Sequence, residues 1–458
     1  MKLRMAAAAA VVLASLACGV LTQPSAPTPD QGAVATAVAA TLAAQSTSTP
    51  PDIPTAILGP TPLPPTATPA PQPERPRAVL QLAYTDENGN IFLWAEDNGI
   101  TQLTFDGGVM DLKLSPDGRY IAYVRDVGYP QTELRVVRLN DGDDRLLVDA
   151  SQFQALITDE YAVGVVVFRF EWLPGAPILL YNTAPVFAGP GAALNQDLWL
   201  VDVGSGEPPR ALLEAGQGGD FVISPDGTQL ALITPESISL ANIDGSNVRR
   251  NVLVFPLVLT YSEYNYYPRP LWAADGSHLL VVIPPAESLA EPPQPTTIWR
   301  IPTDGSPAEM VAQILAAPFF TSQVLISPDL TKMLFARPVG EPEANQNEIV
   351  VANVDGSDEV VYARPRVLSG VFGWAPDSLR FLYWVESGDN LLLGQVGQEP
   401  VSLSDTGRAT GVRWLDERRF FFLNRVGDVW EVRLGEAGGA SRVLATVRGL
   451  PPLYDFAP

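Results

Sequence analysis

The side chains that most often perform catalysis or bind metals are scarce in this sequence. Among its 458 residues there is one cysteine, Cys18, and one histidine, His278. A single cysteine excludes an internal disulfide, and these two residues alone cannot build a zinc site or a Cys/His catalytic pair. We interpret His278, at the start of an expected strand, as structural. The G-x-S-x-G motif of many hydrolases is also missing. We therefore predict that the chain is not an enzyme and uses no cofactor and no metal.

One stretch imitates the start of a calcium-binding loop. Asp86, Asn88 and Asn90 are spaced like the first ligands of such a loop. However, Ile91 occupies the position of the loop's glycine, and Asp97 that of its bidentate glutamate. We interpret the stretch as a turn that connects two strands.

Cys18 lies in a context that predicts its chemistry. A short positive segment with Lys2 and Arg4 precedes an apolar run over residues 5–17, which is too short to span a bilayer stably. Cys18 follows directly, after Ser-Leu-Ala. This arrangement resembles the lipobox of bacterial lipoproteins, although Ser15 stands where leucine is commonest. The resemblance implies acylation of Cys18 and an extracytoplasmic protein anchored at the membrane of the cell envelope. The alternative is ordinary secretory cleavage that leaves a free thiol.

The segment after Cys18 is unsuited to folding. It is rich in proline, threonine and alanine and has no large aromatic residue between residues 22 and 77. Such a composition favours extended polyproline II structure, which reaches about 3.1 Å per residue. We therefore expect a signal peptide over residues 1–17, a disordered linker over 18–77 and a folded domain over 78–458.

The folded part is built from one repeated unit. Each copy has an apolar residue, a small or apolar residue and Pro-Asp-Gly or a variant, which suits a type I turn, and then an apolar strand. The apolar position is occupied, in chain order, by Leu114, Trp172, Ile223, Trp272, Ile326, Trp374 and Trp414. Because this position is always apolar, we assign the four tryptophans to the core rather than to a ligand site.

The repeats predict the fold. Four strands follow one another at a period of roughly 40 to 55 residues, as in the blades of a β-propeller. The Pro-Asp units resemble the propeller repeats of the TolB periplasmic domain and its relatives over residues 78–458. The resemblance implies a TolB-like propeller but says little about a ligand. A counterpart of TolB's separate N-terminal α/β domain is missing from the sequence, so we do not transfer TolB's role in the envelope.

The blade count follows from the spacing of the turns. Seven complete turns lie between residues 114 and 416, and an eighth is split between the two ends of the folded part. Residues 453–458 match the first strand of other repeats and are expected to complete blade one. We predict an all-β fold with a single eight-bladed propeller. Seven blades is the alternative if the weak repeat at Trp172 is not separate.

The two ends of the blades should differ. Tight Pro-Asp and Asp-Gly turns fall on one face of the ring, and the long insertions over residues 182–196, 284–297 and 337–348 fall on the other. A connector on that second face carries four tyrosines, Tyr261, Tyr264, Tyr266 and Tyr267. Exposed tyrosines provide large amphipathic contact area, so we take these four as candidate binding residues. The alternative is that they only cover the rim.

These features favour a binding role. The net charge of −22 opposes binding to nucleic acid. We predict a membrane-anchored, monomeric binding or scaffold module that presents its loop-rich face to a protein or peptide partner. A glycan-binding propeller that uses tyrosine stacking is the first alternative. A propeller hydrolase or lyase with an unrecognised site is the second.

The anchor can be tested directly. Replacing Cys18 by serine removes the thiol that is acylated, so Cys18→Ser should move the protein from the membrane fraction to the soluble fraction. Mass spectrometry of the wild-type N-terminus should find diacylglycerol on Cys18. An unmodified mature N-terminus would contradict the anchor.

Overall fold

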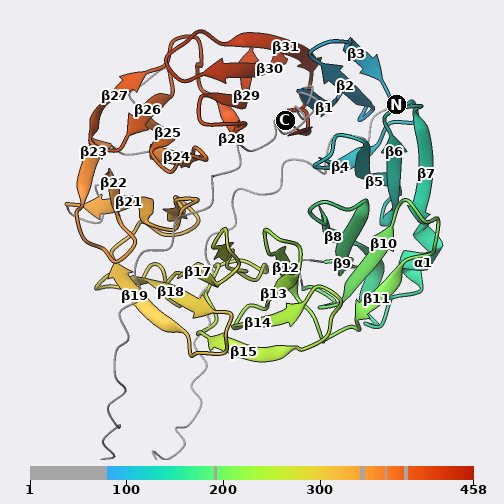
Figure 1. Cartoon of the computed structure of the whole chain (residues 1–458), viewed down its shortest axis with the longest axis horizontal. Coiled ribbons are helices and arrows are strands. Elements are labelled where there is room, and N and C mark those ends of the chain that lie inside the picture. Colours follow the sequence, from blue (N-terminus) through green and yellow to red (C-terminus); the bar gives the residue numbers. More distant parts are fainter. Residues whose placement is uncertain (1–79, 190–192, 341–345, 367–368, 386–389, 458) are drawn as a thin grey trace, which may run out of the picture. The chain divides into compact units, whose positions relative to one another are not determined.

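The computed structural model describes residues 80–189, 193–340, 346–366, 369–385 and 390–457. In this part of the chain, eight four-stranded antiparallel sheets stand around a central channel as the blades of a propeller (Figure 1). The eight-blade prediction is confirmed, and the repeat at Trp172 forms a blade of its own. The predicted signal peptide, Cys18 and the whole linker lie outside the described residues.

The first strand of each blade lies nearest the channel, and the fourth lies at the rim (Figure 1). Blade 1 contains β32 (Tyr454–Ala457), β1 (Gln81–Thr85), β2 (Ile91–Ala95) and β3 (Gly99–Gln102). Blade 2 contains β4 (Val109–Leu114), β5 (Tyr120–Gly128), β6 (Gln131–Arg138) and β7 (Asp143–Val148). Helix α1 (Ala150–Gln154) leads to blade 3, with β8 (Ala162–Trp172), β9 (Ile178–Phe187), β10 (Leu198–Asp202) and β11 (Arg210–Leu213). Blade 4 contains β12 (Asp220–Ile223), β13 (Gln229–Ile233), β14 (Ser237–Asn242) and β15 (Arg249–Val254).

The second half of the ring follows the same order. Blade 5 contains β16 (Leu271–Trp272), β17 (His278–Ile283), β18 (Thr296–Pro302) and β19 (Glu309–Ile314). Blade 6 contains β20 (Leu325–Ile326), β21 (Lys332–Val339), β22 (Gln346–Asn353) and β23 (Val360–Arg366). Blade 7 contains β24 (Ser369–Trp374), β25 (Arg380–Val385), β26 (Leu392–Gln395) and β27 (Gln398–Ser402). Blade 8 contains β28 (Thr410–Trp414), β29 (Arg419–Val426), β30 (Val429–Glu436) and β31 (Arg442–Arg448).

The second strand of each blade forms most of the core. These strands are nearly continuous apolar runs because a neighbouring blade covers each of their faces. Tyr123 in β5, Leu232 in β13 and Phe421 in β29 are at most 1% exposed. The core is therefore a series of layers between adjacent blades rather than a single central cluster.

The Pro-Asp repeat stabilises the turn between the first and second strands. In blade 2, the Ser115 hydroxyl donates to the Asp117 carboxylate at 2.6 Å and accepts the Tyr120 N–H at 2.9 Å. Gly118 follows with a φ of +66°, a conformation that favours glycine. The same serine-aspartate hydrogen bond recurs at Ser224 in blade 4 and at Ser327 in blade 6.

The four tryptophans of the repeat join neighbouring blades. Each indole Nε1 donates to a carbonyl on the innermost strand of the preceding blade. The pairs are Trp172 with Lys113 at 3.0 Å, Trp272 with Val222 at 3.3 Å, Trp374 with Leu325 at 2.9 Å and Trp414 with Gly373 at 3.1 Å. Their assignment to the core agrees with these contacts.

Strand β32 closes the ring, as predicted. It pairs with β1 in the register Gln81↔Ala457 to Tyr84↔Tyr454, so blade 1 combines both ends of the described chain. The Asp455 carboxylate accepts the Leu114 N–H of blade 2 at 2.8 Å and pairs with Arg413 of blade 8 at 2.6 Å. This one side chain therefore connects three blades.

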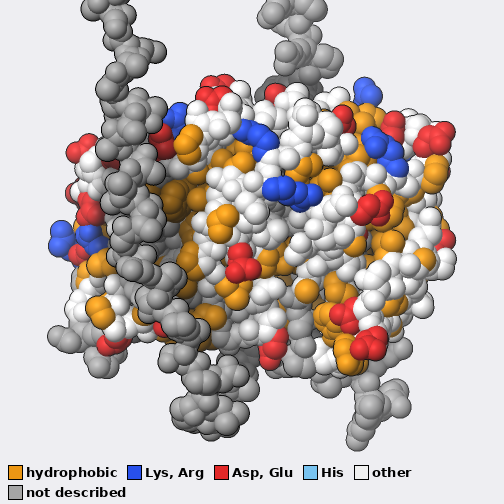
Figure 2. Space-filling model, turned by 90° about the horizontal axis from the view of Figure 1, so that it is seen from below, with side chains coloured by type: hydrophobic (Ala, Val, Ile, Leu, Met, Phe, Trp, Pro, Cys, Tyr) orange, Lys and Arg blue, Asp and Glu red, His pale blue; other side chains and the backbone are white. Residues whose placement is uncertain are grey.

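The outer rim has a mixed surface. Figure 2 shows the side that faces downwards in Figure 1, where hydrophobic side chains lie in patches between polar ones and charges of both signs are interspersed. Within the described residues, no helix has the length and apolar character needed to cross a membrane.

Ring closure predicts a strong truncation effect. Deletion of residues 453–458 removes the innermost strand of blade 1 and leaves the inner edge of β1 unpaired. It also removes apolar side chains such as Phe456, whose ring lies 4.7 Å from that of Phe421. Burial of one such side chain contributes about 1.5–3 kcal/mol. Thermal unfolding should therefore show a large loss of stability, whereas the control Leu450→Ala, at an exposed position, should melt like the wild type. A truncated protein that melts like the wild type would disprove closure by β32.

Candidate functional site

The long connections gather on one face of the ring. The connections between β9 and β10, β17 and β18, and β21 and β22 all lie at the end of the blades opposite the Pro-Asp turns. The segment over residues 255–270, which joins β15 to β16, reaches the same face. We call this the loop face. It carries all four tyrosines that the sequence selected.

The structure divides these tyrosines into two pairs. Tyr261 is 54% exposed and Tyr264 is 61% exposed, so both present their rings to solvent. Tyr266 and Tyr267 are half-buried, with ring centroids 4.7 Å from Phe319 and 6.3 Å from Phe168, respectively. Burial raises the pKa of Tyr266 to about 12. Only the first pair fits the expectation of freely exposed rings.

A groove runs across the loop face between blades 5 and 6, which lie at the lower left of Figure 1. Its inner hollow, of about 260 Å³, reaches the innermost strands β16 and β20. Its outer hollow, of about 320 Å³, lies under the connection between β17 and β18. The two hollows adjoin each other, and Pro284, Thr296, Ala317 and Phe319 line both.

Strand length explains why the groove opens at this place. The innermost strands β16 and β20 have two residues each, whereas β8 has eleven. The loop-face half of blades 5 and 6 therefore lacks a regular inner strand. The segments over residues 255–270 and 315–324 fill this space incompletely and leave the two hollows.

Polar side chains such as Thr296, Gln323 and Asn347 line the groove together with the apolar ones. Among the described residues, Arg269 is the only charged one that lines the inner hollow. Within the described ranges, no hydrogen bond or ion pair reaches its guanidinium. Burial, and secondarily the neighbouring Arg169, lowers the pKa of Arg269 from its ordinary value. The buried hydroxyls of Ser322 in the inner hollow and Ser288 in the outer hollow have no hydrogen-bond partner.

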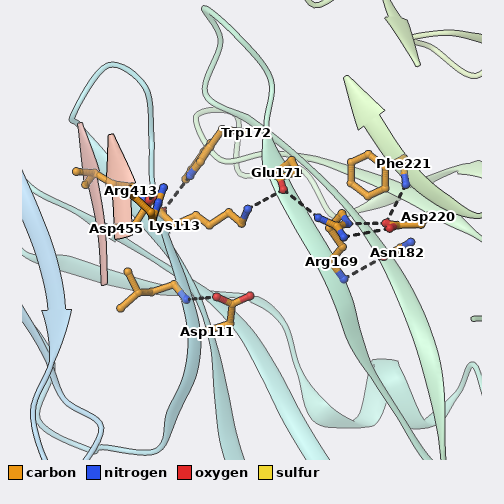
Figure 3. A network of polar contacts seen from close by, with 12 residues as sticks. Asp111, Lys113, Arg169, Glu171, Trp172, Asn182, Asp220, Phe221, Arg413 and Asp455 are labelled. Atoms are coloured by element: carbon orange, nitrogen blue, oxygen red, sulfur yellow. Dashed lines mark hydrogen bonds and ion pairs between the residues drawn. The ribbon is translucent and has the colours of Figure 1, made fainter. Parts of the chain in front are cut away.

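The channel beside the groove contains a network of paired charges, shown in Figure 3. Lys113 of β4 pairs with Glu171 of β8 at 2.6 Å. Arg169, also on β8, donates from two nitrogens to the Asp220 carboxylate of β12, at 2.5 and 3.0 Å. Each of these pairs joins adjacent blades, so the network fixes the innermost strands relative to one another.

Asp111 of β4 differs from the other carboxylates of the network. It accepts the Leu112 N–H at 2.8 Å, but in the described part of the chain it forms no ion pair (Figure 3). Burial raises the pKa of Asp111, while Lys113 partly opposes that rise. Asp111 is therefore the side chain of the network whose charge is least compensated.

The other sequence motifs have structural roles. The Asp86 carboxylate accepts the N–H groups of Asn88 and Asn90 at 3.0 and 2.7 Å and so forms the expected turn. His278 begins β17, and its Nδ1 lies 2.9 Å from the Ser277 hydroxyl. Among the residues described, no cluster of three or more potential ligands could hold a metal ion.

The sequence analysis did not identify Arg269, Phe319, Ser322 or the paired charges of the channel. These residues lie outside the repeated turn. One or two charges within the otherwise apolar inner strands β4, β8 and β12 are the signal that could have revealed the channel network.

Comparisons with known proteins identify the fold alone. No protein-family model matches the chain, and no curated protein matches it. Among solved structures, dihydro-heme d1 dehydrogenase NirN in complex with DHE matches with 14% identity and a TM-score of 0.48, over 83% of this chain and 76% of that one. An oligogalacturonate lyase in complex with manganese matches with 16% identity and a TM-score of 0.43, over 66% and 81%. TolB from Acinetobacter baumannii matches with 14% identity and a TM-score of 0.31, over 62% and 63%.

One sequence-based prediction needs correction. We predicted that the chain is not an enzyme, but a lyase, a dehydrogenase and acylaminoacyl peptidases are among the structures that match this propeller. The prediction depended on the lack of a recognisable motif, and these matches contradict it because they include enzymes of the same fold. We withdraw it. At 12–16% identity the likeness assigns no activity to this chain.

The channel charges predict opposite effects for two matched substitutions. Because the pKa of Asp111 is raised on folding, the folded protein binds that proton more tightly than the unfolded chain, and ionisation costs stability as the pH rises through the raised pKa. Asp111→Asn should therefore stabilise the protein at neutral pH, and the gain should disappear below pH 3.8, the ordinary pKa.

Asp220→Asn serves as the contrast because it breaks a buried pair with Arg169. This substitution should lower the free energy of unfolding by about 3 kcal/mol at neutral pH. Urea unfolding at a series of pH values measures both effects. A destabilised Asp111→Asn protein would show that the Asp111 charge is compensated.

Proposed function

We propose that this protein is a membrane-anchored binding module and that its loop face holds a segment of an extracytoplasmic protein or peptide partner in the groove between blades 5 and 6. The observation that carries the proposal is the groove itself. It consists of two adjoining hollows beside the exposed tyrosines, with walls that combine apolar and polar side chains. Binding sites commonly combine apolar walls with a small number of polar groups that fix orientation.

The surface around the groove supports this role. The Tyr261 hydroxyl accepts the Leu289 N–H at 3.2 Å, and the Tyr261 ring lies 6.3 Å from that of Phe320. Leu289, Tyr261 and Phe320 are all more than half exposed and form a connected apolar border. Contiguous exposed apolar surface in a soluble domain is typical of interaction sites.

The sequence supports the anchored location. Cys18 follows a signal-like segment, and the Pro-rich linker would separate the propeller from the membrane by a long flexible tether. A binding domain on such a tether can sample partners over a wide volume while it stays attached to one surface.

The exposed pair of tyrosines provides the test. The double substitution Tyr261→Ser and Tyr264→Ser should reduce capture of a partner from native envelope extracts at least about tenfold, because tyrosines at interface centres often contribute 2 kcal/mol or more. The melting temperature should change by only a few degrees, since both side chains are exposed. Quantitative mass spectrometry of the captured material gives the readout.

Tyr161→Ser is the matched control, because Tyr161 is 73% exposed and precedes β8 on the same face but away from the groove. It should leave capture unchanged. Equal capture by the wild type and the double variant would contradict the proposal. Capture that resists protease treatment of the extract but is lost after enzymatic removal of glycans would show a glycan ligand instead.

A further inference from the structure

The inner hollow contains a cation without a partner among the described residues. Arg269 lies in the segment before β16 and is one of the residues that line the hollow. The nearest carboxylates are already engaged: Asp220 accepts two bonds from Arg169, and Glu171 pairs with Lys113. Arg269 is an exposed residue whose guanidinium carries five donors and stays charged, so it can bind an anion supplied from outside.

The rest of the hollow combines aliphatic side chains with polar ones such as Thr296 and Gln323. Leu271, Leu280, Val282 and Leu325 contribute aliphatic walls, and Phe319 separates the inner hollow from the outer one. The unpartnered Ser322 hydroxyl adds one donor close to these walls. The volume of about 260 Å³ is small for a ligand pocket and suits a group of the size of one amino acid.

We propose that the inner hollow binds the free C-terminal carboxylate of a partner chain that ends in an apolar residue, with Arg269 holding the carboxylate and the aliphatic walls enclosing the last side chain. This inference rests on the proposed function, because it specifies which segment of the partner enters the groove.

The outer hollow could hold the residues that precede the C-terminal residue of the partner chain. The outer hollow begins at the shared residue Phe319 and is bordered by several prolines and by Glu291. Glu291 is its only charged lining residue among those that the structure describes, so in this part of the chain the groove has a cation at its inner end and an anion in its outer part. An extended peptide could place its terminal carboxylate at Arg269 and a basic or neutral residue beside Glu291.

The chemistry of the walls favours a peptide over an acidic sugar. A uronic acid also carries a carboxylate, but its ring hydroxyls need several polar partners. Aliphatic side chains form most of the inner hollow, and the Phe319 ring is packed against Tyr266 and Phe320 rather than open for stacking. The aliphatic walls and the covered Phe319 ring therefore suit an apolar side chain better than the face of a sugar ring.

The test compares two peptides that differ only in the terminal charge. Acetyl-Pro-Ala-Leu as the free acid and as the C-terminal amide are titrated by calorimetry into the full chain purified in detergent. The acid should bind at least about tenfold more tightly than the amide, as expected for hydrogen bonds to a charged group. Arg269→Gln should reduce this difference to less than about twofold, and Arg269→Lys should retain part of it.

Arg448→Gln is the control for a general change of net charge. Arg448 lies on the outermost strand of blade 8, is exposed and also forms no ion pair within the described residues. This variant should distinguish acid from amide as the wild type does. Because Arg269 forms no structural pair within the described ranges, the Gln variant should also melt like the wild type. The acid and amide comparison on the unaltered protein decides the proposal even where a variant does not fold.

Several results would overturn the inference. Equal binding of acid and amide, no binding of either peptide, or a preference that survives Arg269→Gln would each exclude a carboxylate site at Arg269. Arg269-dependent binding of a uronic-acid disaccharide without binding of the peptide acid would assign the hollow to acidic glycans. If partner capture still depends on Tyr261 and Tyr264 while acid and amide bind equally, the proposed function stands and only this inference fails.

Discussion

The unpaired inner edges of the blades are the constraint on which the rest of the structure depends. The strand nearest the channel has only one neighbour in its sheet, so the backbone groups on its other edge need side chains or water as partners. Tryptophan indoles, such as that of Trp374, donate hydrogen bonds to backbone carbonyls of the innermost strands. The carboxylates of Asp220 and Asp455 accept hydrogen bonds from backbone N–H groups of these strands. Carboxylates placed there need cations in turn, which Arg169 and Arg413 supply. The charged channel is thus explained by the closure of sheets into a ring, without reference to a reaction.

The same requirement separates the scaffold from the candidate site. Around most of the ring, inner strands of four or more residues hold the blades in register. In blades 5 and 6 these strands shorten to two residues, and irregular segments replace the missing strand ends. There the structure places Arg269 without a carboxylate and Ser322 without a hydrogen-bond partner among the described residues. The interruption of the regular inner strands therefore coincides with polar side chains that have no partner among the described residues.

The sequence predicted the features that repeat and missed those that do not. Blade number, ring closure and the packing role of Trp172 follow from a turn that recurs in every blade, and the structure agrees with all three. The groove escaped prediction because Phe319 and Ser322 belong to a connection with no repeated pattern. The burial of Tyr266 could not be predicted either. The residue that packs against it, Phe319, is distant in sequence, and the connector itself gives no sign of this contact. Contacts between different blades decide these features, and a single sequence does not reveal them.

The position of β32 has a consequence for the order in which the protein can fold. The hydrogen bond between Leu114 and Asp455 joins residues 341 positions apart in the chain. Blades 2 to 8 are contiguous in sequence and can form one after another during synthesis. Blade 1 keeps an open inner edge until the last strand is made, because synthesis proceeds from the N-terminus. During that interval β1 exposes an edge that can pair with other strands, so completion of the ring depends on a single short strand.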